Sequence, residues 1–108
     1  MTKAKFLKLL KTLGIPVAYR RFKKEKNKLK KPPFLVYYRT DNDDIHADDI
    51  TFFSSENIVV ELYCTDRNES LEKALEKIFT DNEIPYKVVD ETYIESEDLS
   101  ETIYEIQI

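Results

Sequence analysis

The chain has 108 residues, of which 42% are hydrophobic and 35% are charged, so we expect one domain with a real core. A single glycine excludes the glycine-rich loops that cradle phosphates in Rossmann and P-loop proteins. A single cysteine excludes an internal disulfide and favours a reducing compartment. One cysteine and one histidine supply too few ligands for a tetrahedral zinc site made of nitrogen and sulfur atoms alone. No apolar run approaches the roughly 20 residues of a membrane span, so we expect neither a signal peptide nor an anchor.

The charge is divided unevenly along the chain. Residues 1–31 hold 12 lysines and arginines against one acid, Glu25, whereas residues 32–108 hold 5 basic and 20 acidic residues. The formal net charge of −4 therefore hides two surfaces of opposite sign. Such surfaces either attract partners or further copies by charge complementarity, or are simply two solvated faces, and both interpretations stay open.

The first predicted element is an amphipathic helix over residues 4–13. Gly14 and Pro16 supply its stop. We interpret its lysines as a solvated face, although helices that bind nucleic acid or lipid have the same pattern. Its apolar positions at helical spacing are Phe6, Leu9, Leu10 and Leu13.

A long basic loop is predicted at about residues 14–33. Irregular connections beyond about 12 to 15 residues are usually functional or mobile, so we interpret this segment as an interaction arm. The alternative is a flexible, solubilising loop. Its like charges repel one another, so we expect the arm to become ordered only against an acidic partner surface. The candidate interface residues of the arm are Arg20, Arg21, Lys23, Lys24, Lys26, Lys28, Lys30 and Lys31.

A hairpin with an acidic tip is predicted next. Aromatic and β-branched residues indicate a strand over 34–39, with Phe34, Val36 and Tyr38 on one face, and a second strand over 50–53. The tip must project from the core because unpaired carboxylates cannot be buried. Its candidate interface residues are Asp43, Asp44, Asp48 and Asp49.

The rest of the chain predicts a strand, a helix and two more strands. Residues 58–64 alternate so that Cys64 shares a buried face with Ile58, Val60 and Leu62. Asp66 and Glu69 resemble a capping box, and a stripe of Leu71, Leu75, Ile78 and Phe79 follows. Strands are expected over about 86–94 and 101–108.

These elements predict a single α+β domain over residues 1–108, in the order α-β-β-β-α-β-β. Because strands and helices are segregated, we expect a mostly antiparallel sheet with two helices packed on one face.

No arrangement of residues favours catalysis. Cys64 is in phase with core residues and has no histidine near it in sequence, and the acids around Glu95 and Glu97 have no nucleophile beside them. Residues 41–49 superficially resemble a calcium loop, but its sixth position is His46 instead of glycine. We expect no catalytic residue, no cofactor and no metal site, and hence no enzyme.

Several short motifs follow one another along the chain. They are GIPVAY at 14–19, PPFLVYY at 32–38, AD at 47–48, IVVELY at 58–63 with Asp66, YIESEDL at 93–99 and IYEI at 103–106. The order of these motifs resembles that of the tail-completion proteins of long-tailed bacteriophages and prophages, which are similar in fold to the tail-terminator, or tail-to-head joining, proteins.

The resemblance implies a structural virion protein without a cofactor. Six copies would form a ring on the last ring of the major tail tube protein, stop tube growth and join the head-completion or connector protein. DNA would pass through the ring without specific binding, and the acidic tip would face that channel or a neighbouring subunit. The implied location is the head-proximal end of the virion tail, with the host cytoplasm during assembly and no membrane partner. The basic residues 20–31 are not a fixed part of the family pattern.

A small nucleic-acid-binding module is the alternative function. The basic residues 20–31 would grip phosphates while Phe22, Tyr37 or Tyr38 stacks on bases. The charge of −15 on residues 32–108 argues against this alternative. A metal-dependent nuclease that uses the hairpin acids is a more distant one.

Overall fold

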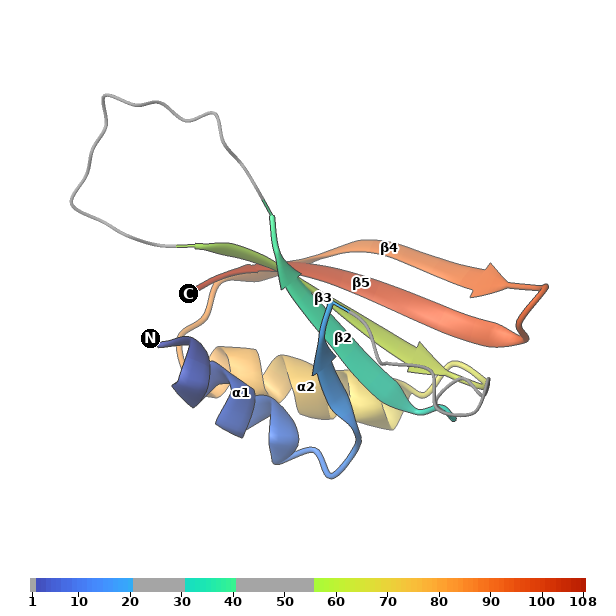
Figure 1. Cartoon of the computed structure of the whole chain (residues 1–108), viewed down its shortest axis with the longest axis horizontal. Coiled ribbons are helices and arrows are strands. Elements are labelled where there is room, and N and C mark those ends of the chain that lie inside the picture. Colours follow the sequence, from blue (N-terminus) through green and yellow to red (C-terminus); the bar gives the residue numbers. More distant parts are fainter. Residues whose placement is uncertain (1, 21–30, 41–55) are drawn as a thin grey trace.

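A computed structural model describes residues 2–20, 31–40 and 56–108, in which two helices pack against a five-stranded sheet (Figure 1). The strands lie in the order β1-β2-β3-β5-β4. Strand β1 is parallel to β2, and the other three neighbouring pairs are antiparallel. The predicted α+β class and mostly antiparallel sheet are confirmed. The elements are α1 (Lys3–Lys11), β1 (Val17–Tyr19), β2 (Phe34–Arg39), β3 (Asn57–Cys64), α2 (Glu69–Asp81), β4 (Tyr86–Ile94) and β5 (Leu99–Gln107).

The predicted element order is also confirmed, but its first strand is not the expected one. Strand β1 lies inside the segment 14–33 that was predicted to be a loop. It pairs with β2 through Val17 opposite Leu35 and Tyr19 opposite Tyr37. The prediction of a loop was therefore wrong for residues 17–19. Three residues are too few to display the alternating pattern that predicts a strand. The strand predicted at 50–53 lies outside the described residues.

Both helices cover the same face of the sheet, as predicted (Figure 1). Phe6 and Leu10 of α1 and Leu75 and Phe79 of α2 are fully buried there. Each such side chain stabilises the fold by about 1.5 to 3 kcal/mol relative to exposure. The strands contribute Leu35, Tyr37, Ile58, Val60, Leu62, Cys64, Tyr104 and Ile106 to this core.

The opposite face of the sheet carries the residues of β2 that were predicted to lie together. Phe34 stacks on Tyr63 of β3, with the ring centroids 4.9 Å apart. The hydroxyl groups of Tyr38 and Tyr63 both donate to the Glu61 carboxylate, at 2.9 and 2.8 Å. This second face is therefore a network of aromatic rings and a carboxylate.

The start of α2 differs from the predicted capping box. The N-cap is Asn68, whose Oδ1 accepts a 3.0 Å hydrogen bond from the Leu71 backbone N–H. Asp66 lies two residues further from the helix, so the prediction that it caps α2 was wrong. Asparagine and aspartate cap helices about equally well, and spacing alone did not separate them.

Candidate functional site

Most of the predicted interface residues lie outside the described parts of the chain. Those in the arm are Arg21, Lys23, Lys24, Lys26, Lys28 and Lys30, and those in the hairpin tip are Asp43, Asp44, Asp48 and Asp49. His46 and the calcium-like segment lie outside them as well. Arg20 and Lys31 are described, and both are exposed.

Arg20 comes directly after β1 and ends it. Its φ of 70° leaves the extended region, while its backbone N–H donates to the Tyr37 carbonyl at 2.8 Å. The guanidinium lies 5.5 Å from the ring centroid of Tyr19, and its hydrogen bond lowers the pKa of that exposed phenol. Arg20 is thus a fixed positive charge at the β1 edge of the sheet.

The two edges of the sheet have opposite charge. At one edge, α1 carries four exposed lysines and Arg20 follows β1, and neither α1 nor β1 contains an acid. Lys3 forms a 3.5 Å ion pair with Glu56, which precedes β3. We call this the basic edge, defined by Lys3, Lys5, Lys8, Lys11 and Arg20. At the other edge, β4 and the turn after it carry five exposed acids and one lysine. We call this the acidic edge, defined by Asp90, Glu91, Glu95, Glu97 and Asp98.

Strand β4 is exposed along nearly its whole length of nine residues. It pairs with β5 on one side only, because it is the last strand of the sheet. Four large apolar side chains on it are partly exposed: Tyr86, Val88, Val89 and Tyr93, with exposed fractions of 37%, 44%, 47% and 50%, although the ring of Tyr86 also packs on Phe79. A long edge strand with apolar side chains is a template for pairing with another strand.

Two features of β4 restrict that pairing. Its register shifts between Val88 and Asp90, which indicates a bulge at Val89. Charged residues also interrupt the apolar ones, and Lys87 forms a 3.6 Å ion pair with Glu105. Bulges and edge charges are the devices by which sheets avoid indiscriminate aggregation, so β4 is protected against indiscriminate pairing.

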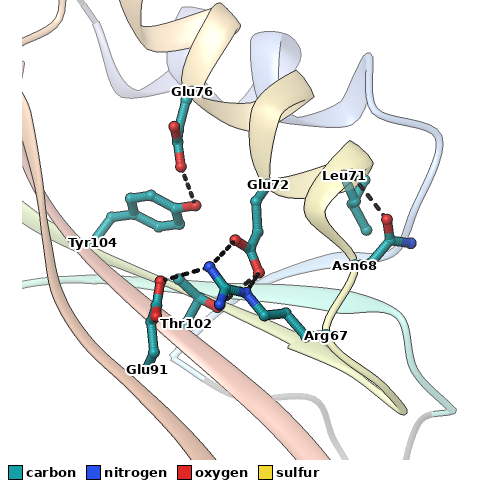
Figure 2. Close-up of polar contacts among 8 residues, drawn as sticks. All are labelled: Arg67, Asn68, Leu71, Glu72, Glu76, Glu91, Thr102 and Tyr104. Carbon is teal, nitrogen blue, oxygen red and sulfur yellow. Dashed lines mark hydrogen bonds and ion pairs between the residues drawn. The ribbon is translucent and has the colours of Figure 1, made fainter.

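A polar cluster joins α2 to the acidic edge (Figure 2). Glu72 of α2 is only 6% exposed, and its carboxylate lies 3.4 Å from Nε of Arg67. Nη2 of Arg67 lies 3.2 Å from the carboxylate of Glu91 on β4, and the Thr102 hydroxyl donates to Glu72 at 3.3 Å. One guanidinium thus lies between two carboxylates, and these contacts, together with that of the Thr102 hydroxyl, fasten α2 to β4 and β5.

Tyr104 makes a second link between the sheet and α2. Its ring is fully buried, and its hydroxyl donates to the Glu76 carboxylate at 2.9 Å (Figure 2). Burial, followed by this hydrogen bond, raises the pKa of Tyr104. The phenol is thereby held as a neutral donor at neutral pH.

Cys64 is buried, as its strand parity predicted. Burial, with a smaller contribution from the charge of Glu72, raises the pKa of its thiol. A buried thiol with a raised pKa is a poor nucleophile. Within residues 2–20, 31–40 and 56–108, no three histidine, cysteine or carboxylate side chains gather where they would hold a metal ion.

No helix in the described parts of the chain is both long and apolar enough to cross a membrane. The chain matches no protein-family model, and a search of curated proteins gives no match either.

The feature that sequence reasoning missed is the exposed edge. The strand at 86–94, which is β4, was predicted, but its place in the sheet was not. It lies at the end because β4 pairs with β5, while β5 and not β4 pairs with β3. The interruption of the apolar residues of β4 by Lys87, Asp90 and Glu91 was the available signal, because internal strands seldom carry charges on both faces.

Proposed function

We propose that this chain is a structural subunit, six copies of which form a ring that caps a phage tail tube and joins the tail to the head connector. The proposal comes from the family resemblance of its motifs. The structural observation that carries it is the pair of unlike edges, the basic edge at β1 and the acidic edge at β4. Closed rings are built from head-to-tail contacts between two different surfaces of one chain.

The exposed apolar residues of β4 support an assembly role independently of charge. Tyr86, Val88, Val89 and Tyr93 are partly exposed on a strand whose outer backbone groups have no strand beside them in the described sheet. A neighbouring protein surface would remove these side chains from water and satisfy the backbone groups.

The test is assembly with the tail tube protein of the same phage. We expect tubes of uniform length that carry a ring of this chain at one end, seen by electron microscopy, and a ring mass of six chains. A solution monomer agrees with the proposal, because such a ring can require the tube as its template. Tubes that keep growing in the presence of the folded chain would contradict it.

The second candidate is the nucleic-acid-binding module. The observation that favours it is the basic edge, whose five described cations are exposed and of which only Lys3 forms an ion pair between described residues, with Glu56. A salt titration with random-sequence DNA separates the two functions. Phosphate binding weakens steeply as salt rises, whereas a ring subunit that lets DNA pass gives no binding signal at any salt concentration.

A further inference from the structure

One row of paired residues crosses the whole sheet and ends in an exposed apolar side chain at each edge. Tyr19 of β1 lies opposite Tyr37, Tyr37 opposite Val60, Val60 opposite Tyr104, and Tyr104 opposite Val88 of β4. Tyr19 is 43% exposed and Val88 is 44% exposed. The two edges therefore present matching apolar groups at the same level of the sheet.

The strand directions permit these edges to meet. Strand β1 runs parallel to β2, β3 runs opposite to β2, β5 runs opposite to β3, and β4 runs opposite to β5. Strand β4 is therefore antiparallel to β1. A rotation about an axis along the strands keeps every strand direction, so β4 of one copy meets β1 of the next in the antiparallel sense. Antiparallel pairing is slightly the more stable kind.

We propose that β4 of one copy pairs with β1 of the next copy, so that the sheet continues from subunit to subunit with Val88 beside Tyr19. The occupant of the exposed β4 edge is a second copy of this chain. This contact specifies how neighbouring subunits of the proposed ring would meet. It rests on the proposed function in one respect, namely that the copies contact one another head to tail.

Charge complementarity selects this partner edge. In the proposed register, continuing the rows of the sheet places Glu91 beside Val17 and Asp90 beside Ala18. These acids then approach the basic edge of the next copy, whose α1 lies beside β1. Pairing β4 with β4 of a second copy would instead bring two acidic edges together, which like-charge repulsion disfavours.

The length of the contact explains why it needs a ring. Strand β1 has only three residues, and the positive φ of Arg20 ends it. One such contact is short, so we expect weak pairing between two free copies. Closure of a ring on a template makes every contact intramolecular and adds their strengths.

Cysteine cross-linking tests the proposed register. In a Cys64→Ala background, we would mix Tyr19→Cys chains with Val88→Cys chains and oxidise them, both free and on tail tubes. Residues directly opposite one another in antiparallel strands have Cα atoms about 4.5 to 5.5 Å apart, within the reach of a disulfide. We expect cross-linked dimers in the mixture and none in either variant alone, whereas a double variant with both cysteines should form a ladder of linked chains.

The controls make each outcome decisive. Thr80→Cys, exposed at the end of α2, should not link to Val88→Cys. Dimers of Val88→Cys alone would reveal two-fold β4 pairing and overturn the inference, as would a mixture without cross-links in both settings. If the chains cap tubes but the disulfide between Tyr19→Cys and Val88→Cys does not form, the contact between β4 and β1 is overturned and the proposed function stands. If the disulfide forms but the chains never cap a tube, the proposed function is overturned and the contact stands.

A charge substitution gives a second measurement that does not depend on disulfide geometry. Val88→Lys should reduce ring formation at least about tenfold, because a lysine on an edge strand opposes pairing. Val88→Thr keeps a β-branched side chain, so this variant should retain most of the ring formation of the unmodified chain. Circular dichroism and thermal unfolding verify that both variants are folded. Equal ring yields for the two folded variants would overturn the inference.

Discussion

Arg67 is half exposed, yet it is the partner of Glu72, the most buried carboxylate among the described residues. Its Nε lies 3.4 Å from Glu72 Oε2 and its Nη2 lies 3.5 Å from Oε1, so the guanidinium faces both carboxylate oxygens. A buried carboxylate without a partner is strongly destabilising, whereas a paired one is tolerated. The position of α2 on the sheet therefore depends on a residue that lies outside the helix.

This relationship predicts that Glu72→Gln rescues the loss of Arg67. Arg67→Met should lower the free energy of unfolding, measured in urea, because it leaves the Glu72 charge buried without its ion pair. Adding Glu72→Gln should recover about 1 to 3 kcal/mol, the usual cost of an unsatisfied buried polar group. Lys77→Met, which breaks the exposed pair with Asp81, is the matched control and should cost at most about 0.5 kcal/mol. Additive effects of the two substitutions would contradict the pairing.

Tyr38 predicts a loss of stability at alkaline pH. Burial, together with its hydrogen bond to Glu61, raises the pKa of Tyr38 to about 12 in the folded chain. An unfolded tyrosine ionises near about pH 10. The folded state therefore binds the phenolic proton more tightly, so this contribution is complete below about pH 10 and is lost as pH rises through about 12.

The measurement is the free energy of unfolding from about pH 9 to about pH 12, with tyrosinate absorbance followed in parallel. Tyr38→Phe should cost about 1 kcal/mol at neutral pH and should flatten the alkaline decline. Tyr19→Phe is the control, because the pKa of Tyr19 is lowered and its removal should not flatten the curve. Identical alkaline slopes for the wild type and Tyr38→Phe would show that Tyr38 is not linked to folding.

Cys64 should react slowly with a thiol reagent in the native chain. The side chain is 6% exposed, and burial raises the pKa of its thiol, so both access and the thiolate fraction are reduced. We expect modification at least about tenfold slower than that of a Thr80→Cys, Cys64→Ala chain, and equally fast modification of the two chains in denaturant. Comparable native rates would mean that β3 opens readily at this position.

The elements that the sequence predicts well are those whose pattern is long. The stripe of α2 and the parity of β3 extend over several periods, and Leu75, Phe79, Ile58 and Leu62 are buried as expected. Strand β2 is apolar or aromatic at five consecutive positions, so its pattern does not tell which face meets the helices.

The features that were missed depend on contacts between distant residues. Arg67 meets Glu91, which lies 24 positions along the chain, and only the fold brings them together. The place of β4 at the end of the sheet likewise follows from the strand order, and the charged residues Lys87, Asp90 and Glu91 were the only local signal of its exposure. Local sequence patterns contain periodicity and caps, but they do not specify which strand becomes the edge of the sheet.

Glu83 predicts a stabilising substitution at the end of α2. Helix α2 ends in a Schellman motif, in which the Ile84 N–H donates to the Phe79 carbonyl at 2.8 Å and the Glu83 N–H donates to the Thr80 carbonyl at 3.1 Å. The residue in the left-handed position is Glu83, with a φ of 54°, where glycine is the usual choice. A side chain in this conformation costs roughly 1 to 2 kcal/mol, and glycine avoids that cost.

Glu83→Gly should therefore raise the free energy of unfolding by about 1 kcal/mol, after the larger entropy of glycine in the unfolded chain is subtracted. Glu83→Ala is the matched control, because it removes the same carboxylate but keeps a Cβ and hence the strain. Urea denaturation of the three chains measures both effects. If alanine stabilised the chain as much as glycine, the gain would come from the lost charge; if neither did, the left-handed turn would carry no strain at this position.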